Sequence, residues 1–194
     1  MRLIQCSKCN SDATEEIIYR GKKSYRCLVC GNIAPLKNAI DSRLKLSLDK
    51  HAKVYHLSIG FLLQNKAGKI FVGQKRTPPY EWNLIFGHVH SGETIEAAAN
   101  REFMEGVGLP LGKHKLLFKT MAAHICPIGA DKHLIHVFRV IVPVINNILP
   151  NREFKQIFWL EPQELKNKKF KRLSAGAKLI LEKSDISGNA KKSK

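Results

Sequence analysis

The residues from Gly87 to Leu109 place acidic side chains at fixed spacings inside an otherwise basic chain, and this pattern limits the fold more than any other part of the sequence. The segment has helical composition from Thr94, which is suited to cap a helix. On that helix Glu102 and Glu105 share one face, where two carboxylates could jointly hold a hard divalent cation. The alternative is an acidic helix face that is only solvated.

The same segment resembles the signature of the Nudix hydrolases. That signature has a glycine, a glutamate after five residues and an Arg-Glu pair after seven more, followed by further acidic, apolar and glycine positions. The positions that match it in register are Gly87, Glu93, Arg101, Glu102, Phe103, Glu105, Gly108 and Leu109. The Trp82-Asn83 run and the strand-to-helix step from Phe158 to Leu165 are also similar to the family. The resemblance covers about residues 53–181.

The resemblance implies an α/β fold, the Nudix-type α/β/α sandwich with a mixed sheet, and hydrolysis of a nucleoside diphosphate linked to another group. The residues that it implies for catalysis are Glu93, Arg101, Glu102 and Glu105. It makes Glu102 and Glu105 ligands of Mg²⁺ or Mn²⁺ together with the backbone carbonyl of Gly87, and Glu93 and Arg101 a structural pair. In the family a further carboxylate often comes from a loop. Glu153 resembles that ligand, with an ordinary surface glutamate as the alternative.

One position departs from the signature. Gly106 stands where the family has a glutamate that is a central metal ligand, so the site loses a negative charge and two oxygens. Either another group takes its place or hydrolysis is weakened or abandoned. His88 and His90 are candidates for the group that replaces the missing metal ligand, although histidines in loops are more often simply exposed to solvent. Because glycine in a helix costs about 1 kcal/mol relative to alanine, replacing Gly106 is expected to stabilise the helix.

Four of the five cysteines form two pairs at metal-binding spacing. Cys6 and Cys9 are separated by two residues, as are Cys27 and Cys30, and seventeen residues lie between the pairs. Two such turns joined by a hairpin can point four thiolates at one tetrahedral site, which zinc prefers. Two disulfides are the alternative. Since all four ligands are protein side chains, we expect the zinc to be structural, in a ribbon too small to bury a sufficient core.

The chain is expected to contain four parts. Residues 1–35 form the zinc ribbon, 36–52 a linker or short helix, 53–183 the Nudix domain and 184–194 a disordered basic tail. A hairpin is predicted around Gly21 in the ribbon. Strands are predicted at 55–63, 70–72, 116–121, 134–144 and 156–160, and helices at 94–106, from Pro162 and at about 174–183.

The charge balance favours polyanionic partners. Lys and Arg total 33 against 16 Asp and Glu, a net charge of +17 that suits nucleotides, RNA or another nucleic acid. The basic stretch from Lys166 to Arg172 could follow a nucleic-acid backbone or be a solvated surface. Trp82 and Phe86 could bind substrate by stacking on a base, with core packing as the alternative. Without a signal segment or a long apolar run, we expect a cytoplasmic protein with no membrane partner.

A second metal site could be imagined from Cys126, His124, His133 and His136. His133 and His136 are three apart on a predicted strand and therefore face opposite ways. We favour unrelated positions for these four residues.

Two function hypotheses follow. A zinc ribbon ahead of a Nudix domain is similar in arrangement to the NADH pyrophosphatases, but their Ser-Gln-Pro-Trp-Pro-Phe-Pro run is absent after Leu109. Phe86 stands where isopentenyl-diphosphate isomerases have their active cysteine, so isomerase chemistry is not expected. We expect metal-dependent hydrolysis of a pyrophosphate bond in a nucleotide-sugar, a dinucleotide or a nucleotide-capped RNA. The alternative is a catalytically degenerate Nudix module that binds nucleotide or RNA without cleaving it.

Overall fold

The computed structural model describes residues 4–9, 11–35, 40–41, 43–51, 54–77, 80–122, 132–142, 153–166 and 172–184. Its internal contacts divide the chain into two compact units, each built from several segments. The first unit comprises Met1–Leu57, His88–Thr94 and Met121–Leu134, and the second comprises Ser58–Gly87, Ile95–Thr120 and Ile135–Lys194. Among the described residues, every helix is too short or too polar to cross a membrane.

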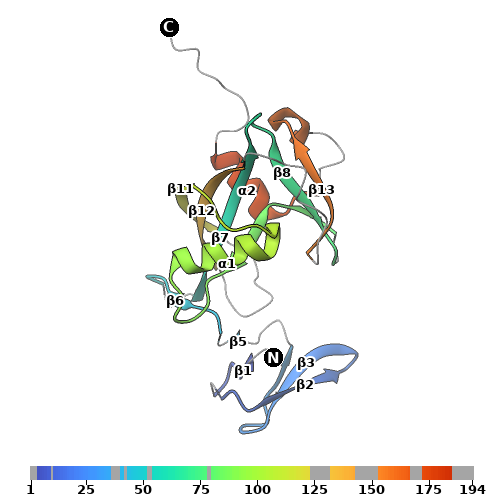
Figure 1. Ribbon diagram of the computed structural model, residues 1–194. Helices are drawn as coiled ribbons and strands as arrows, with labels where there is room; N and C mark the ends of the chain where they lie inside the picture. Colours follow the sequence, from blue (N-terminus) through green and yellow to red (C-terminus); the bar gives the residue numbers. More distant parts are fainter. Residues whose placement is uncertain are drawn as a thin grey trace. The chain divides into compact units, whose positions relative to one another are not determined.

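The elements are labelled in chain order (Figure 1). The strands are β1 (Ile4–Gln5), β2 (Thr14–Tyr19), β3 (Lys22–Cys27), β4 (Ile33–Pro35), β5 (Ile40–Asp41), β6 (Leu46–Leu48), β7 (Val54–Asn65), β8 (Ile70–Lys75), β9 (Trp82–Asn83), β10 (Ile85–His88), β11 (His114–Ala122), β12 (Lys132–Val142) and β13 (Phe154–Leu160). The helices are α1 (Ile95–Val107) and α2 (Ala175–Lys183), with a short 3₁₀ helix, η2 (Pro162–Lys166). The helices predicted from the sequence are therefore confirmed to within one or two residues.

Strands β2, β3 and β4 form an antiparallel sheet near the N-terminus. Arg20 and Gly21 join β2 to β3, and both have positive φ, 50° and 73°. A two-residue turn with both residues in the left-handed region matches the twist of the flanking strands. The hairpin predicted around Gly21 is confirmed. Its small apolar cluster consists of Ile4, Cys6, Tyr25 and Cys27.

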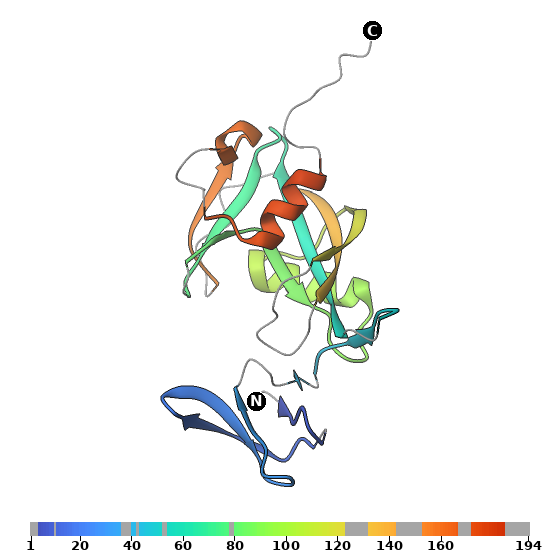
Figure 2. The ribbon, with the colours of Figure 1, turned by 180° about the vertical axis from the view of Figure 1, so that it is seen from behind.

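The largest sheet has the strand order β11-β12-β7-β8-β13, with β6 and β10 also pairing with β7, and β9 with β8. Helix α1 lies in front of this sheet in Figure 1, whereas α2 lies in front of it in Figure 2, where the molecule is turned by 180°. The two helices therefore cover opposite faces of the sheet. The predicted α/β sandwich with a mixed sheet is confirmed.

Strand β7 is buried on both faces over residues 58–65. Its sequence alternation, with Ile59, Phe61 and Leu63 on one side, predicts only one buried face. The intervening positions are buried as well, because a sheet covered by helices on both sides has no solvated face. At Gly60 the cover is close, since a Cβ there would lie 2.8 Å from Cδ1 of Ile180 in α2.

The segment predicted as a linker or short helix contains strands instead. Strand β6 pairs antiparallel with the start of β7, with Leu46 opposite His56 and Leu48 opposite Val54. The alternation of Leu44, Leu46 and Leu48 is a strand pattern that indicates this pairing. The predicted tail lies outside the described residues beyond position 184.

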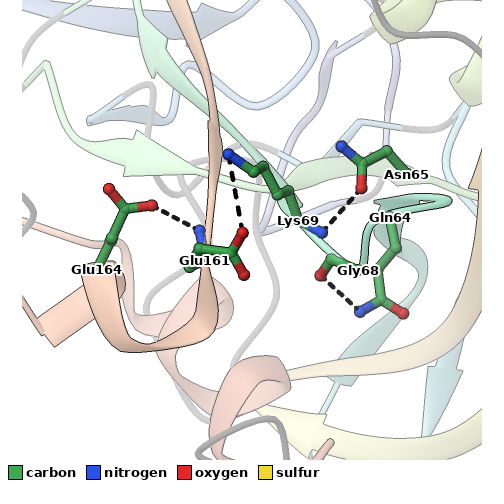
Figure 3. Close-up of polar contacts among 6 residues, drawn as sticks. All are labelled: Gln64, Asn65, Gly68, Lys69, Glu161 and Glu164. Carbon is green, nitrogen blue, oxygen red and sulfur yellow. Dashed lines mark hydrogen bonds and ion pairs between the residues drawn. The ribbon is translucent and has the colours of Figure 1, made fainter.

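The turn between β7 and β8 is tied to the end of β13 by polar contacts (Figure 3). The backbone N–H of Lys69 donates to Oδ1 of Asn65 at 2.9 Å, and its Nζ lies 3.7 Å from Oε1 of Glu161. The backbone N–H of Glu161 in turn donates to Oε2 of Glu164 at 2.7 Å, at the start of η2. Antiparallel pairing holds β13 beside β8 from Phe154 opposite Lys75 to Leu160 opposite Ile70, so β13 begins directly after Glu153.

The close contact between β8 and β13 at Gly73 predicts an effect on stability. A Cβ at Gly73 would overlap the fully buried ring of Phe154. We expect Gly73→Ala to lower the free energy of unfolding by about 1–3 kcal/mol, because the ring must leave its position in a packed core.

Gly112→Ala is the matched control, since nothing lies within 4 Å of an added Cβ there. Its effect should stay within about 0.5 kcal/mol. Urea denaturation followed by circular dichroism measures both variants. Equal stability of the two would contradict the close contact.

Candidate active site

Helix α1 buries one face and exposes its carboxylates on another. The buried residues are Ala98, Ala99, Phe103, Gly106 and Val107. The side chain of Glu102 is 14% exposed, whereas that of Glu105 is 62% exposed. Gly108, with φ of 76°, follows the helix and donates its backbone N–H to the carbonyl of Met104 at 2.8 Å. The two predicted ligands therefore differ in burial: the Glu102 side chain is mostly buried, and the Glu105 side chain is exposed to solvent.

The carboxylate of Glu102 occupies the space beside Cα of Gly87. A Cβ at Gly87 would overlap this carboxylate, so any larger residue would displace the end of the Glu102 side chain from this position. The missing side chain brings the backbone of β10 next to the carboxylate oxygens of α1. The structure thus places together two groups that the resemblance implies as ligands of one metal.

Arg101 contacts both helix glutamates that are predicted to bind the metal. Its Nη1 lies 2.6 Å from Oε1 of Glu102 and 3.6 Å from Oε1 of Glu105. The guanidinium is 25% exposed, so it is partly shielded from solvent. A single cation therefore balances two carboxylates that would otherwise repel each other.

Glu153 reaches the same region from outside the helix. Its carboxylate forms an ion pair with Lys75 at the end of β8, and both side chains are about a quarter to a third exposed. Its backbone carbonyl accepts a hydrogen bond from Arg76 at 3.0 Å. Both contacts position Glu153 just ahead of β13.

Gly106 is a packing position as well as a departure from the signature. A Cβ there would lie 2.8 Å from Cγ2 of Ile85 in β10 and 3.7 Å from Oε2 of Glu153. The first distance is shorter than carbon atoms normally approach. This close approach argues against the expectation that replacing Gly106 stabilises the helix, because helix propensity is opposed by a clash with Ile85. The second distance shows that a carboxylate from the loop before β13 already lies beside this position.

Glu93 lies in the loop before α1. Its Oε2 accepts a hydrogen bond from the backbone N–H of His90 at 2.9 Å, and Gly92 between them has φ of 79°. The carboxylate therefore stabilises the loop that it belongs to. The structural pair of Glu93 with Arg101 stays a prediction.

Comparison with known proteins agrees with this arrangement. The family model described as NUDIX domain matches residues 54–182, about two thirds of the chain. The chain belongs to the Nudix family.

Individual relatives are similar over shorter stretches or at lower identity. An RNA pyrophosphohydrolase of Wolbachia pipientis subsp. Culex pipiens (strain wPip) is 41% identical over 56 residues, 29% of this chain and 35% of that protein. The chain thus spans about a third of the length of the curated relatives it matches.

Two solved structures show the shared Nudix fold. The MutT protein of Methanosarcina mazei Go1 is 20% identical, with a TM-score of 0.56 over 68% of this chain and 93% of that chain. The E. coli dihydroneopterin triphosphate pyrophosphohydrolase is 19% identical, with a TM-score of 0.55 over 69% and 99%. At these identities the likeness concerns the fold alone.

The predicted substrate-binding rings of the Nudix domain contact the protein interior. Trp82 is 4% exposed and lies edge-on to Phe158, with 5.3 Å between ring centroids. The ring of Phe86 lies 3.1 Å from the positions that a Cβ would take at Gly60 and at Gly176. The contacts of Trp82 with Phe158 and of Phe86 with Gly60 and Gly176 are packing contacts. Substrate binding by Trp82 and Phe86 stays a prediction.

The four paired cysteines converge outside the matched Nudix residues. Sγ of Cys6 lies 3.7 Å from Sγ of Cys30, and Sγ of Cys9 lies 3.6 Å from Sγ of Cys27, with all four within 4.8 Å of one another. These are thiol distances, well beyond the roughly 2.05 Å of a disulfide. A tetrahedron with metal–sulfur bonds of about 2.3 Å has edges of about 3.8 Å. The cluster fits a four-thiolate metal site.

Ionisation of these thiols is mutually dependent. Burial opposes ionisation of Cys6, but the backbone N–H groups of Lys8 and Cys9 lower its pKa to about 6. The backbone N–H of Ser11 favours the Cys9 thiolate, but the neighbouring thiols and burial raise the pKa of Cys9 to about 12. Four thiolates this close therefore need a cation between them.

Three histidines form a cluster that the sequence analysis does not predict. His56 on β7, His88 on β10 and His133 on β12 each offer a ring nitrogen within 4.8 Å of the others. His136 does not join them; burial and the positive charge of Lys119 lower its pKa, which keeps the ring neutral. Cys126 and His124, which the sequence analysis considered together with His133 and His136 as a second metal site, lie outside the described residues.

The contact between Gly106 and Ile85 makes a second prediction about stability. We expect Gly106→Ala to lower the free energy of unfolding by about 1–3 kcal/mol, even though alanine favours a helix by about 1 kcal/mol. In an Ile85→Ala background the contacting methyl group is gone, so the same substitution should become neutral or stabilising.

Urea denaturation of the parent, both single variants and the double variant measures this coupling. Additive effects would show that Gly106 and Ile85 do not constrain each other.

Proposed function

We propose that this Nudix protein hydrolyses a pyrophosphate bond in a nucleoside diphosphate derivative. The observation that carries the proposal is the convergence of Glu102 with the backbone of Gly87, and of Glu153 with the empty side-chain position at Gly106. Three carboxylates and one carbonyl are hard oxygen donors, the type that Mg²⁺ and Mn²⁺ prefer. The chemical type of these donors therefore fits the metal that the family implies.

In this proposal Glu153 supplies the carboxylate that Gly106 cannot. Its Oε2 lies 3.7 Å from the point where a side chain at position 106 would begin. Glu102, Glu105 and Glu153 would hold the metal, with the carbonyl of Gly87. Bound there, Mg²⁺ or Mn²⁺ would neutralise charge on the phosphate oxygens and make a bound water nucleophilic.

Two cations complete the site. Arg101 contacts Glu102 and Glu105, and Lys75 contacts Glu153. Each holds a carboxylate in place, and each could turn to a phosphate oxygen when substrate binds. This arrangement gives the site both acidic donors for a metal and basic groups for a polyphosphate.

The proposed substrate class is supported by the names of related proteins and by the charge of the chain. The names of the Wolbachia and E. coli proteins describe cleavage of pyrophosphate bonds in RNA and in dihydroneopterin triphosphate. The net charge of +17 also suits a substrate rich in phosphate. Nucleotide-sugars, dinucleotides and nucleotide-capped RNA are the candidates.

A degenerate binding module is the second candidate, and Gly106 is the observation that favours it. With the family glutamate absent, the metal could bind too weakly for turnover while Arg101 and Lys75 still attract phosphate. Hydrolysis and binding must therefore be measured separately.

The carboxylate variants distinguish these candidates. We expect Glu102→Gln to abolish hydrolysis, and Glu153→Gln to raise the Mn²⁺ concentration needed for half-maximal rate by at least about 10-fold, because each removes a charged ligand. Glu96→Gln is the matched control, since Glu96 lies on the same helix, is 58% exposed and contacts His114. Phosphate release from nucleoside diphosphate derivatives and capped RNA, titrated with Mn²⁺ and Mg²⁺, gives the rates.

An activity that survives Glu102→Gln would show that helix α1 does not hold the catalytic metal. If the parent and all three variants are inactive but bind nucleotide equally, the binding module is correct.

We also propose that Cys6, Cys9, Cys27 and Cys30 hold a structural zinc. The support is the match between their Sγ distances and the edges of a zinc–thiolate tetrahedron. Few side chains are buried around them, with Ile4 and Tyr25 as the main apolar members, so the metal would supply much of the local stability. A ribbon of the kind seen ahead of NADH pyrophosphatases is the interpretation that the resemblance favours.

Replacing Cys27, which is 1% exposed, tests the zinc. We expect Cys27→Ser to eliminate thiolate-bound zinc, seen by X-ray absorption as loss of zinc–sulfur bonds of about 2.3 Å. Cys126→Ser, which alters the one cysteine outside the two pairs, should leave that signal unchanged. Protein purified under reducing conditions that shows no zinc–sulfur signal would refute the proposal.

A further inference from the structure

We propose that His56, His88 and His133 form a second transition-metal site, made of three imidazoles and chemically distinct from the carboxylates and the thiols. One ring nitrogen of each lies within 4.8 Å of the others. All three residues belong to the first compact unit. The inference does not depend on hydrolysis.

The strand pairing explains why residues so far apart in sequence meet. His56 lies near the start of β7, and β7 pairs with β12, which carries His133, and with β10, which carries His88. The backbone N–H of Val89 donates to the carbonyl of Leu57 at 2.9 Å, which aligns β10 with this part of β7. Neighbouring positions on paired strands bring side chains of one face close together. The sheet therefore presents three rings from three strands at one place.

The ring geometry matches a tripod around one ion. The ring centroids are 5.2 Å apart for His56 and His88, 5.6 Å for His56 and His133, and 5.2 Å for His88 and His133. With metal–nitrogen bonds of about 2.1 Å at tetrahedral angles, the centroids of three imidazoles are roughly 5.2 Å apart. Octahedral angles of 90° would bring them to roughly 4.5 Å, so the spacing favours a tetrahedral ion.

The surroundings favour neutral imidazole, which is the form that binds metals. His56 is 0% and His133 is 6% exposed, and the Nε2 atoms of all three rings are buried. Burial disfavours imidazolium, and three cationic rings at this spacing would repel one another. Edge-to-face packing of aromatic rings gives similar centroid distances. Packing alone, however, does not require three ring nitrogens to converge.

The ligand type selects the metal. Imidazole nitrogen is a borderline donor that suits Zn²⁺, Co²⁺, Ni²⁺ and Cu²⁺, whereas Mg²⁺ prefers oxygen. Three imidazoles leave one tetrahedral position for a water or another ligand. We assign the site to Zn²⁺. An ion there would join β7, β10 and β12, adding a link across the sheet beside the loop that precedes α1.

Cobalt substitution of the full chain tests the site. Co²⁺ bound by imidazoles gives visible d–d absorption without the thiolate charge-transfer band that the four-cysteine site would give. In the Cys27→Ser variant, which removes the four-thiolate site, we expect this imidazole-type spectrum, its retention in a large excess of Mg²⁺, and its loss when Zn²⁺ is added. The parent should show thiolate bands in addition, which separates the two proposed sites.

His88→Gln is the informative variant, because His88 is less buried than His56 or His133 and its replacement is less disruptive. We expect it to weaken Zn²⁺ binding at least about 100-fold, since it removes a direct ligand. His90→Gln is the matched control: His90 lies two residues away and outside the cluster. Added Zn²⁺ should raise the thermal unfolding temperature of a Cys27→Ser background and of its His90→Gln derivative, but not of its His88→Gln derivative.

Several outcomes would overturn the proposal. A Cys27→Ser variant that shows no imidazole-type Co²⁺ spectrum has no imidazole site. Equal Zn²⁺ affinity of His88→Gln and His90→Gln would show that any bound ion lies elsewhere. If Mg²⁺ displaces the Co²⁺ spectrum, the ion is held by carboxylates.

Discussion

The close approach of helix α1 to strand β10 is the constraint on which the site depends. Each element contributes a glycine where the other comes nearest: Gly87 of β10 beside Glu102, and Gly106 of α1 beside Ile85. A Cβ at Gly106 would clash with the buried Ile85 side chain, and one at Gly87 would displace the Glu102 carboxylate from the β10 backbone. Without that approach the Glu102 carboxylate would not lie against the β10 backbone. The site is therefore built by the absence of two side chains as much as by the carboxylates themselves.

The cations at the site contact the same carboxylates that are proposed to bind the metal, so both groups can change partners when metal and substrate bind. In a chain of net charge +17, Arg101 pairs with Glu102 and Glu105, and Lys75 pairs with Glu153. The Glu105 side chain is 62% exposed, so its pair contributes only about 0–1 kcal/mol to folding because solvent screens it. That pair therefore costs little to break when other partners arrive. Under the proposed hydrolysis, the carboxylates would turn to the metal and the cations to phosphate oxygens, so the same five side chains serve both states.

The sequence predicted what local patterns determine. The composition of α1 and α2, the β2–β3 hairpin and the convergence of four cysteines all follow from patterns within about 25 residues. It did not predict that Gly106 contacts Ile85 or that Glu153 lies beside it, because both depend on how β13 and α1 pack around the sheet. Strand β6 has a short alternation of leucines that a basic composition obscured. The histidine cluster joins three strands with no spacing rule between them, so only the strand pairing could find it.

The chain separates its candidate metal ligands by donor atom. The Glu102 carboxylate lies against Gly87, the four thiols lie together in the N-terminal segment, and the three imidazoles lie on β7, β10 and β12. Borderline ions such as Zn²⁺ bind sulfur and nitrogen donors more tightly than Mg²⁺ does, whereas oxygen donors suit Mg²⁺ and Mn²⁺. If the cysteine and histidine sites retain Zn²⁺, the oxygen site, which binds metal more weakly, would be left to Mg²⁺, the abundant hard cation. Selectivity at that site would then come from metal availability and not from geometry, which matters because Gly106 leaves it with one fewer helix carboxylate than the family signature supplies.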